Sequence, residues 1–249
     1  MGRSGVSAQE AYDRLAPHYR AYACARAAYL DAVDRYVIEH APKGASLLDV
    51  GAGDGVRAAA IARAIAASHV VLCEPSERMA SLCRLRSVAQ VWTQPAENLP
   101  VTSERFDVVT CLWNVLGHLP DRTARIRALA GMRRLLAPGG RIFCDVNNRH
   151  NARAYGPLRV LGRRMLDAVY PDDRRGDAVF EWRIGDERIP GRGHLFTPGE
   201  MDSIVHEAGL RIEERIAVDY LSGAPSPRPW DGQLVYRLAA PFSETGISQ

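Results

Sequence analysis

The stretch from Ser46 to Val56 constrains the fold of this chain more than any other. Its first half is an apolar run that ends at Val50 and predicts a buried β-strand. Three glycines follow at alternate positions, namely Gly51, Gly53 and Gly55. An alanine-rich segment over 57–67 then predicts a helix. Glycine accepts a positive φ and lets a ligand approach the backbone closely. The stretch therefore predicts an α/β unit with a ligand at the turn between strand and helix.

The glycine spacing separates this turn from the dinucleotide fingerprint G-x-G-x-x-G, because Val56 occupies the place of the third glycine. Two carboxylates, Asp49 and Asp54, flank the turn. Negative side chains disfavour a pyrophosphate and favour a ligand with positive charge. S-adenosylmethionine carries a sulfonium and an ammonium group and no phosphate. A glycine-rich turn that binds nothing is the alternative for this segment alone.

The run D-V-G-A-G-D-G over 49–55 resembles the first motif of the class I S-adenosylmethionine-dependent methyltransferases. The resemblance extends over 46–146 and is weaker over 8–40 and 194–240. It implies an α/β fold with a doubly wound, mostly parallel sheet of seven strands, and S-adenosylmethionine as the cofactor. It also implies cofactor contacts from the first motif, at Asp49, Gly51, Ala52, Gly53 and Gly55.

An acidic residue, Glu74, ends the strand predicted over 68–73, one βαβ unit after the glycines. A carboxylate at this place accepts hydrogen bonds from both hydroxyls of a ribose in nucleotide-binding folds. Pro75 follows it, and Met79 on the next predicted helix is either an adenine contact or a filler of the core. The family resemblance adds two residues that edge the adenine, Ala96 and Glu97.

The run C-L-W-N-V-L-G-H-L over 111–119 resembles glycine N-methyltransferases and related small-amine N-methyltransferases. That resemblance implies that Asn114 faces the substrate and that three residues contact the cofactor, namely Cys111, Leu112 and His118. In those enzymes an arginine after the fifth strand holds the substrate carboxylate. Here Asn147 occupies the aligned position and Arg149 lies two residues later. Both are candidate substrate contacts, and the departure leaves open a neutral, hydroxylated or larger amine.

The segment Y-D-R-L-A-P-H-Y over 12–19 resembles the N-terminal lid of many small-molecule methyltransferases. In those families a tyrosine and a following arginine meet the methionine end of the cofactor, which assigns Tyr19 and Arg26. A guanidinium forks onto a carboxylate, which suits Arg26 to that end. A helical core stripe with a solvated arginine is the alternative. Tyr12 is assigned to the substrate. No single catalytic base is assigned; the candidates are Tyr12, His118, His150 and His194.

Composition excludes several classes of function. The formal net charge of +3 argues against a dedicated nucleic-acid binder, and the single lysine, Lys43, nearly excludes lysine catalysis. The five cysteines show no C-x-x-C spacing, which favours buried thiols in a reducing cytosol over a metal site. No apolar run is long enough to span a membrane, and the N-terminus has no signal-peptide core. We therefore expect a cytoplasmic protein with a small-molecule substrate and without a metal, nucleic-acid or membrane partner. Its oligomeric state, monomer or homodimer, is open.

The chain divides into four predicted segments: an N-terminal helical lid over 1–40, the cofactor-binding core over 41–150, a cap insert over 151–193, and a C-terminal completion of the sheet over 194–249. Within the cap, alternating apolar residues predict a strand over 179–184 and a turn at Gly185–Asp186.

Together these features predict methyl transfer by in-line displacement to a small-molecule acceptor, at an amine nitrogen in preference to an oxygen. A small-molecule O-methyltransferase is the nearest alternative. A non-catalytic module that binds S-adenosylmethionine and scaffolds a partner is the alternative of another class.

Overall fold

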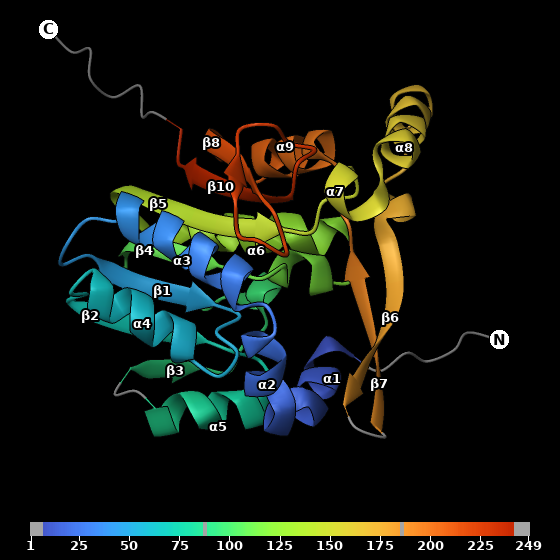
Figure 1. Cartoon of the computed structure of the whole chain (residues 1–249). Helices are drawn as coiled ribbons and strands as arrows, with labels where there is room; N and C mark the ends of the chain where they lie inside the picture. The colour runs from blue at the N-terminus through green and yellow to red at the C-terminus, as the bar shows by residue number, and fades with distance from the viewer. Residues whose placement is uncertain (1–6, 87–88, 185–186, 242–249) are drawn as a thin grey trace, which may run out of the picture.

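A single large sheet organises the molecule, of which the computed structural model describes residues 7–86, 89–184 and 187–241. Its strand order is β3-β2-β1-β4-β5-β10-β8-β9 (Figure 1). The strands are β1 (Ser46–Val50), β2 (His69–Cys73), β3 (Gln90–Trp92), β4 (Phe106–Cys111), β5 (Leu136–Val146), β8 (Arg211–Val218), β9 (Pro225–Ser226) and β10 (Gln233–Ala239). Strands β1 to β5 are parallel, whereas β10 runs antiparallel to both β5 and β8. The predicted mostly parallel sheet of seven strands is confirmed, and the two-residue β9 adds an eighth at its edge.

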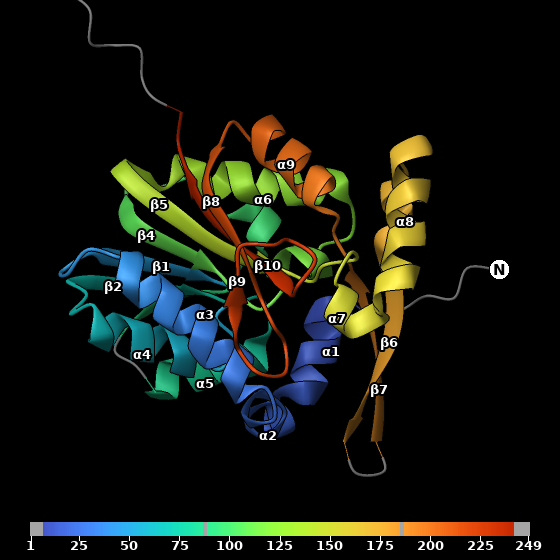
Figure 2. The ribbon, with the colours of Figure 1, turned by 45° about the horizontal axis from the view of Figure 1, so that its top comes forward.

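Helices cover both faces of this sheet (Figures 1 and 2). One face carries α3 (Ala27–His40), α4 (Val56–Ala64) and α5 (Glu77–Arg86), and the other carries α6 (Arg122–Arg134) and α9 (Pro198–Glu207). Successive side chains of a strand point to opposite faces. In β1, Leu47 packs with the cluster of α3 and α4, while Leu48 and Val50 pack with the cluster of α6 and α9. The sheet is therefore buried on both sides, as expected of a parallel sheet.

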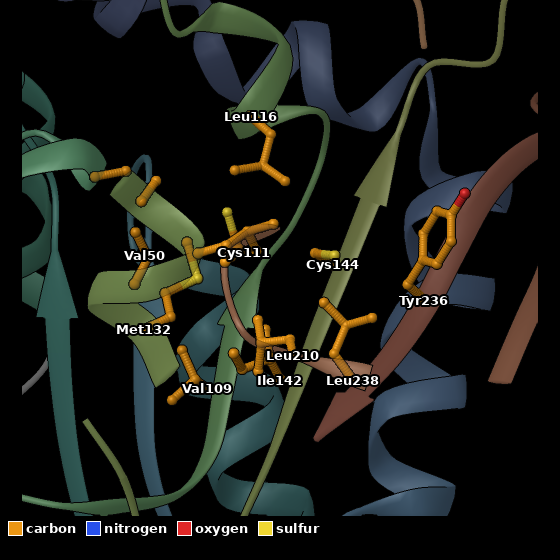
Figure 3. Close-up of a cluster of buried hydrophobic side chains, with 14 of the residues drawn as sticks. Val50, Val109, Cys111, Leu116, Met132, Ile142, Cys144, Leu210, Tyr236 and Leu238 are labelled. Carbon is orange, nitrogen blue, oxygen red and sulfur yellow. The ribbon is translucent and has the colours of Figure 1, made fainter. Parts of the chain in front are cut away.

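The larger apolar cluster lies between the sheet and the pair α6 and α9 (Figure 3). Val109 on β4, Ile142 on β5 and Leu238 on β10 project from neighbouring strands, and Met132 on α6 packs over them. All four side chains are fully buried. Each buried side chain of this size stabilises the fold by about 1.5–3 kcal/mol. This core fixes the carboxyl ends of the strands, where the loops of the candidate site begin.

One element differs from its predicted bounds. The sequence predicts a helix over 121–136 and a strand over 141–146, separated by residues 137–140 with their proline and two glycines, but these four residues lie inside β5. The pairing of β4 with β5 shifts register between Phe106 and Val108, which accommodates the extra residues as a bulge. A Cβ atom on Gly140 would lie 2.8 Å from the carbonyl oxygen of Phe106. The glycine thus allows close approach of the two backbones rather than ending the strand.

The lid and the cap meet over the carboxyl ends of the strands. The lid contains α1 (Ala8–Leu15), η1 (Ala16–His18) and α2 (Tyr19–Cys24), and the cap contains a hairpin of β6 (Asp177–Ile184) and β7 (Glu187–His194). Leu15 on the lid packs against Trp182 and Ile189 of the hairpin. The strand predicted over 179–184 is part of β6, whereas the turn predicted at Gly185–Asp186 lies outside the described residues.

The remainder of the insert is helical, with α7 (Ala152–Tyr155), α8 (Pro157–Val169) and η4 (Asp173–Gly176). In both views α8 stands at the edge of the molecule beside β6. None of the helices in the described ranges is long and apolar enough to cross a membrane. The division of the chain into lid, core, cap and completion segments stays a prediction.

Candidate active site

The turn after β1 is built from left-handed backbone. Gly51, Gly53 and Gly55 have φ angles of 77°, 57° and 75°, a region that side-chain-bearing residues rarely adopt. A Cβ atom on Gly51 would lie 2.4 Å from Cγ2 of Val115, and one on Gly53 would lie 2.7 Å from the hydroxyl oxygen of Tyr19. The turn therefore requires glycine for its conformation and for the close approach of its neighbours.

A cavity of about 650 Å³ lies above this turn, between the strand ends, the lid and the cap hairpin. Its size falls in the range of small-molecule sites. Ten residues predicted from the sequence line it, namely Tyr12, Tyr19, Gly51, Gly53, Glu74, Pro75, Ala96, Glu97, Leu112 and His118. They come from five separate segments of the chain, and the fold brings them to one place.

Glu74, directly after β2, is the buried carboxylate of the cavity. Its Oε2 accepts a hydrogen bond from the backbone N–H of Gly53 at 2.8 Å, and its Oε1 accepts one from Ser76 at 2.9 Å. Burial raises the pKa of Glu74 to about 7. A carboxylate oxygen accepts more than one hydrogen bond, so each oxygen keeps capacity for a further donor such as a hydroxyl group.

Glu97 lies on η2 (Ala96–Asn98), across the cavity from the lid. Its Oε2 is buried and has no hydrogen-bond partner among the described residues. A buried acceptor without a partner destabilises the protein by about 1–3 kcal/mol. A ligand that brings an N–H donor, such as the amino group of adenine, would complete it.

A hydrogen-bonded pair of side chains, Tyr12 and His118, lies between the lid and the cap. Nδ1 of His118 is 3.0 Å from the carbonyl oxygen of Arg192 on β7, which can only accept, so Nδ1 carries a proton. Nε2 of the neutral ring then accepts from the hydroxyl of Tyr12 at 3.1 Å. Burial lowers the pKa of His118 and raises the pKa of Tyr12 well above its usual value. The pair is therefore a neutral phenol and a neutral imidazole.

Aromatic rings form the wall around this pair. The ring of Trp182, on β6, lies with its centroid 5.5 Å from that of Tyr12, and Trp113 lies 5.7 Å from Tyr19. Both tryptophans line the cavity, and neither was singled out from the sequence. The predicted strand over 179–184 could have indicated Trp182, because a large aromatic in a cap strand has one face on the interior. Trp113 gave no such signal.

Several predicted cofactor residues lie beneath or beside the cavity instead of lining it. Cys111 and Met79 are fully buried in apolar clusters. Asp49 accepts a hydrogen bond from the hydroxyl of Thr110 at 2.6 Å, and burial raises its pKa to about 6. Ala52 is buried in a small apolar cluster beneath the turn, and Gly55 is the N-cap residue of α4. Their predicted contacts with a cofactor stay predictions.

Arg26 also lies outside the residues that line the cavity. Its guanidinium carbon is 4.2 Å from the centroid of the Tyr22 ring, and it donates a weak hydrogen bond to the Tyr22 carbonyl at 3.4 Å. This position fits the alternative of a lid arginine that packs on a neighbouring ring. A contact with a cofactor carboxylate stays a prediction and needs the side chain to leave this ring.

Three predicted substrate residues, Asn114, Asn147 and Arg149, and the candidate base His150 are engaged elsewhere. Arg149 and His150 both meet the carboxylate of Asp167 on α8, at 3.2 Å and 3.0 Å. The side chain of Asn114 is buried and accepts a hydrogen bond from the backbone N–H of Asn147 at 2.9 Å. None of these four predicted residues is among the cavity lining. The side chain of Asn114 supports the loop that follows β5, and the predicted substrate and catalytic roles of these four residues stay predictions.

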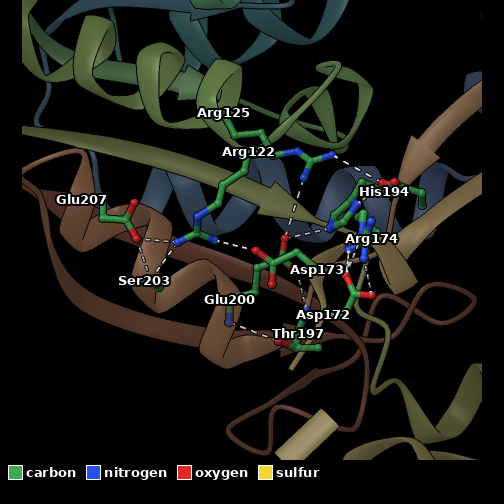
Figure 4. A network of polar contacts seen from close by, with 11 residues as sticks. Arg122, Arg125, Asp172, Asp173, Arg174, His194, Thr197, Glu200, Ser203 and Glu207 are labelled. Carbon is green, nitrogen blue, oxygen red and sulfur yellow. Dashed lines mark hydrogen bonds and ion pairs between the residues drawn. The ribbon is translucent and has the colours of Figure 1, made fainter. Parts of the chain in front are cut away.

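His194 belongs to a polar network beside the cavity (Figure 4). Its Nδ1 lies 2.7 Å from Asp177 at the start of β6, and its Nε2 lies 2.8 Å from Glu200 on α9. Carboxylates only accept, so an imidazolium is the form that donates to both. Arg125 on α6 lies 3.8 Å from Glu200. His194 therefore ties both ends of the cap hairpin to the core helices.

Comparisons with known proteins identify the family to which this chain belongs. A family of proteins described as a methyltransferase domain matches residues 18–215 of the chain. The chain belongs to this family and is an S-adenosylmethionine-dependent methyltransferase. Its cofactor is S-adenosylmethionine. The glycine turn without space for side chains, the buried Glu74 and the unpartnered Glu97 fit this cofactor.

Relatives of this methyltransferase carry different names. A ubiquinone biosynthesis O-methyltransferase of Pseudomonas putida is 32% identical over 184 residues, 71% of this chain and 69% of the relative. Among solved structures, the sugar N-methyltransferase KedS8 of Streptoalloteichus sp ATCC 53650 is 20% identical, with a TM-score of 0.60 over 90% of this chain and 92% of that one. CalS10 of Micromonospora echinaspora, an amino pentose methyltransferase, is 20% identical with a TM-score of 0.60 over 88% and 95%. The likeness to the two structures shows the fold.

Proposed function

We propose that this methyltransferase methylates an amine nitrogen of a small molecule. The observation that carries the proposal is the weak proton acceptor at the cavity. Burial lowers the pKa of His118, and a backbone carbonyl rather than a carboxylate orients its ring. A hydroxyl group must lose its proton to attack well, which favours a strong base. A neutral amine attacks with its lone pair and loses a proton only afterwards.

The residues that would hold the cofactor follow from the cavity. Glu74 would accept from the two ribose hydroxyls, and Glu97 would accept from the adenine amino group beside Ala96. Gly51, Gly53 and Tyr19 line the same cavity and would hold the amino-acid end of the cofactor. When bound, S-adenosylmethionine supplies a methyl group that its sulfonium already activates. The pair of Tyr12 and His118 lines the same cavity and would lie beside the acceptor.

The protein's contribution to the reaction is positioning and proton removal. The rings of Tyr12, Trp113 and Trp182 confine the acceptor, and such positioning supplies about 7–11 kcal/mol of a barrier. Their apolar surface favours the uncharged amine over its ammonium form. After transfer, the hydroxyl oxygen of Tyr12 accepts the nitrogen's proton while its own proton passes to Nε2 of His118. His118 then releases a proton to solvent.

The named relatives divide between the two acceptor atoms. The ubiquinone biosynthesis enzyme acts on oxygen, and this supports the O-methyltransferase alternative. KedS8 and CalS10 resemble this chain over 90% and 88% of its length, and are named for sugar nitrogen and amino pentose acceptors.

Within the described residues, no group of three or more His, Cys, Asp or Glu side chains is placed to hold a metal ion.

Kinetics of two variants test the proposed roles. We expect Tyr12→Phe and His118→Gln each to lower kcat for an amine acceptor by about tenfold. This is less than the roughly 10²–10⁴-fold effect of a group that moves a proton in the transition state, because here the proton leaves the nitrogen after the transfer. The dissociation constant of S-adenosylhomocysteine, measured by calorimetry, should stay within about twofold of the parent. Unchanged kcat in both variants would remove this pair from the mechanism. The variant His69→Gln, at an exposed histidine, is the matched control.

A further inference from the structure

Helix α8 presents its apolar side to solvent. Leu158, Leu161, Met165 and Val169 are spaced by three or four residues and share one side of the helix. These four side chains are between 53% and 84% exposed. Among the described residues, α8 holds five of the eleven large apolar side chains that are exposed, because Leu166 joins the four. Such a concentration marks an interaction surface rather than scattered surface residues.

The opposite side of α8 is the one that packs on the protein. Val160 is buried there, and the carboxylate of Asp167 meets Arg149 and His150. Arg163 donates to the carbonyl oxygen of Arg149 at 3.1 Å. The helix is thus anchored by its polar side, the reverse of an ordinary surface helix. Its apolar side is held outward by these contacts and cannot turn into the core without breaking them.

The charges beside the apolar stripe are positive. Arg159 follows Leu158, and Arg164 precedes Met165, so one guanidinium lies on each border of the stripe at 100° per residue. Both residues are exposed, and Arg164 lies over the ring of Trp230 at 5.2 Å. The acidic residue of the helix, Asp167, faces away from the stripe. An apolar stripe with basic borders matches an interfacial helix that lies in the head-group region of a bilayer.

We propose that α8 attaches this methyltransferase to an anionic lipid surface. Burial of the stripe among the acyl chains removes exposed apolar surface, while Arg159 and Arg164 reach the phosphate groups. A second copy of the chain suits the stripe less well, because a twofold pairing would bring like-charged borders together. The expectation of no membrane partner considered segments that span a bilayer, and a helix that lies on its surface is a different element.

Co-sedimentation of the full chain with vesicles tests this inference. We expect binding to vesicles of phosphatidylcholine with phosphatidylglycerol, weaker binding to phosphatidylcholine alone, and a loss of the difference at high salt. The double variant Leu158→Gln and Met165→Gln should lower the partition coefficient by at least about tenfold. Arg159→Gln and Arg164→Gln should each lower it by about fivefold on the anionic vesicles only. Leu85→Gln, at an exposed leucine of α5, is the matched control.

Three results would overturn the inference: no sedimentation with anionic vesicles, equal binding of the double variant and the parent, or a dimer in light scattering that the double variant dissociates without any vesicle binding. The last result would assign the stripe to a second copy. All of these residues lie outside the cavity, so affinity for S-adenosylhomocysteine should be unchanged in every variant. The proposed membrane attachment through α8 and the proposed amine acceptor are therefore tested independently, and either can be wrong while the other is right.

Discussion

Glu74 is the residue whose charge should control the affinity for the cofactor. Burial raises its pKa to about 7, and the ionised form is the better acceptor for ribose hydroxyls. Its ionised fraction rises from about one tenth at about pH 6 to about nine tenths at about pH 8. Affinity for S-adenosylhomocysteine should therefore increase by about tenfold over this range, and decrease again as the pH falls.

Calorimetry of Glu74→Gln isolates this residue from the titration of the ligand's own amine. The variant should bind S-adenosylhomocysteine about 10- to 100-fold more weakly at about pH 8, because a hydrogen bond to a charged group contributes about 1.5–3 kcal/mol. The rise in affinity between about pH 6 and about pH 8 should also be smaller in the variant, because the part caused by ionisation of Glu74 is absent. The variant Glu77→Gln, at an exposed residue that begins α5, is the control. Identical pH profiles for parent and Glu74→Gln would contradict the assignment.

At the scale of the element, the sequence predicted regular segments well and strained loops poorly. Apolar runs located β1 and β2, because most residues of both strands are buried in the sheet. The loop after β4 is different, since Trp113 and Asn114 both adopt positive φ. A positive φ at a non-glycine residue cannot be predicted from its residue type, because the surrounding structure imposes it. This turn directs Trp113 into the cavity and Asn114 behind it, which the linear motif did not separate.

The cap hairpin depends on one buried ion cluster. Substituting His194→Leu leaves Glu200 buried without its 2.8 Å donor, and we expect the free energy of unfolding to fall by about 3 kcal/mol. Urea denaturation measures this change. The control, His69→Leu, breaks a half-exposed contact with Glu104 and should change stability by less than about 1 kcal/mol. Equal effects of the two substitutions would show that the cluster does not anchor the hairpin.

At the scale of the whole molecule, the cavity combines segments that are far apart in the chain. Local motifs predicted many of the residues that line it, because a glycine-rich turn and a carboxylate at a strand end can be recognised within about 30 residues of sequence. The acceptor end was less predictable, since it depends on how the hairpin of β6 and β7 packs on the lid. The contact between the Arg192 carbonyl and His118 joins residues 74 positions apart, and no local pattern encodes it. Arg149 shows the opposite case. Its place in the sequence suggested a substrate contact, but in the fold its side chain pairs with Asp167 on α8.

The most direct test of the proposed reaction is the position of the transferred methyl group. The enzyme would be incubated with methyl-labelled S-adenosylmethionine and amino alcohols or aminophenols, each of which offers a nitrogen and an oxygen on one skeleton. Mass spectrometry of the products then locates the label. We predict N-methylated product, formed more slowly when Tyr12 or His118 is replaced. Label found on oxygen alone would contradict the proposed function.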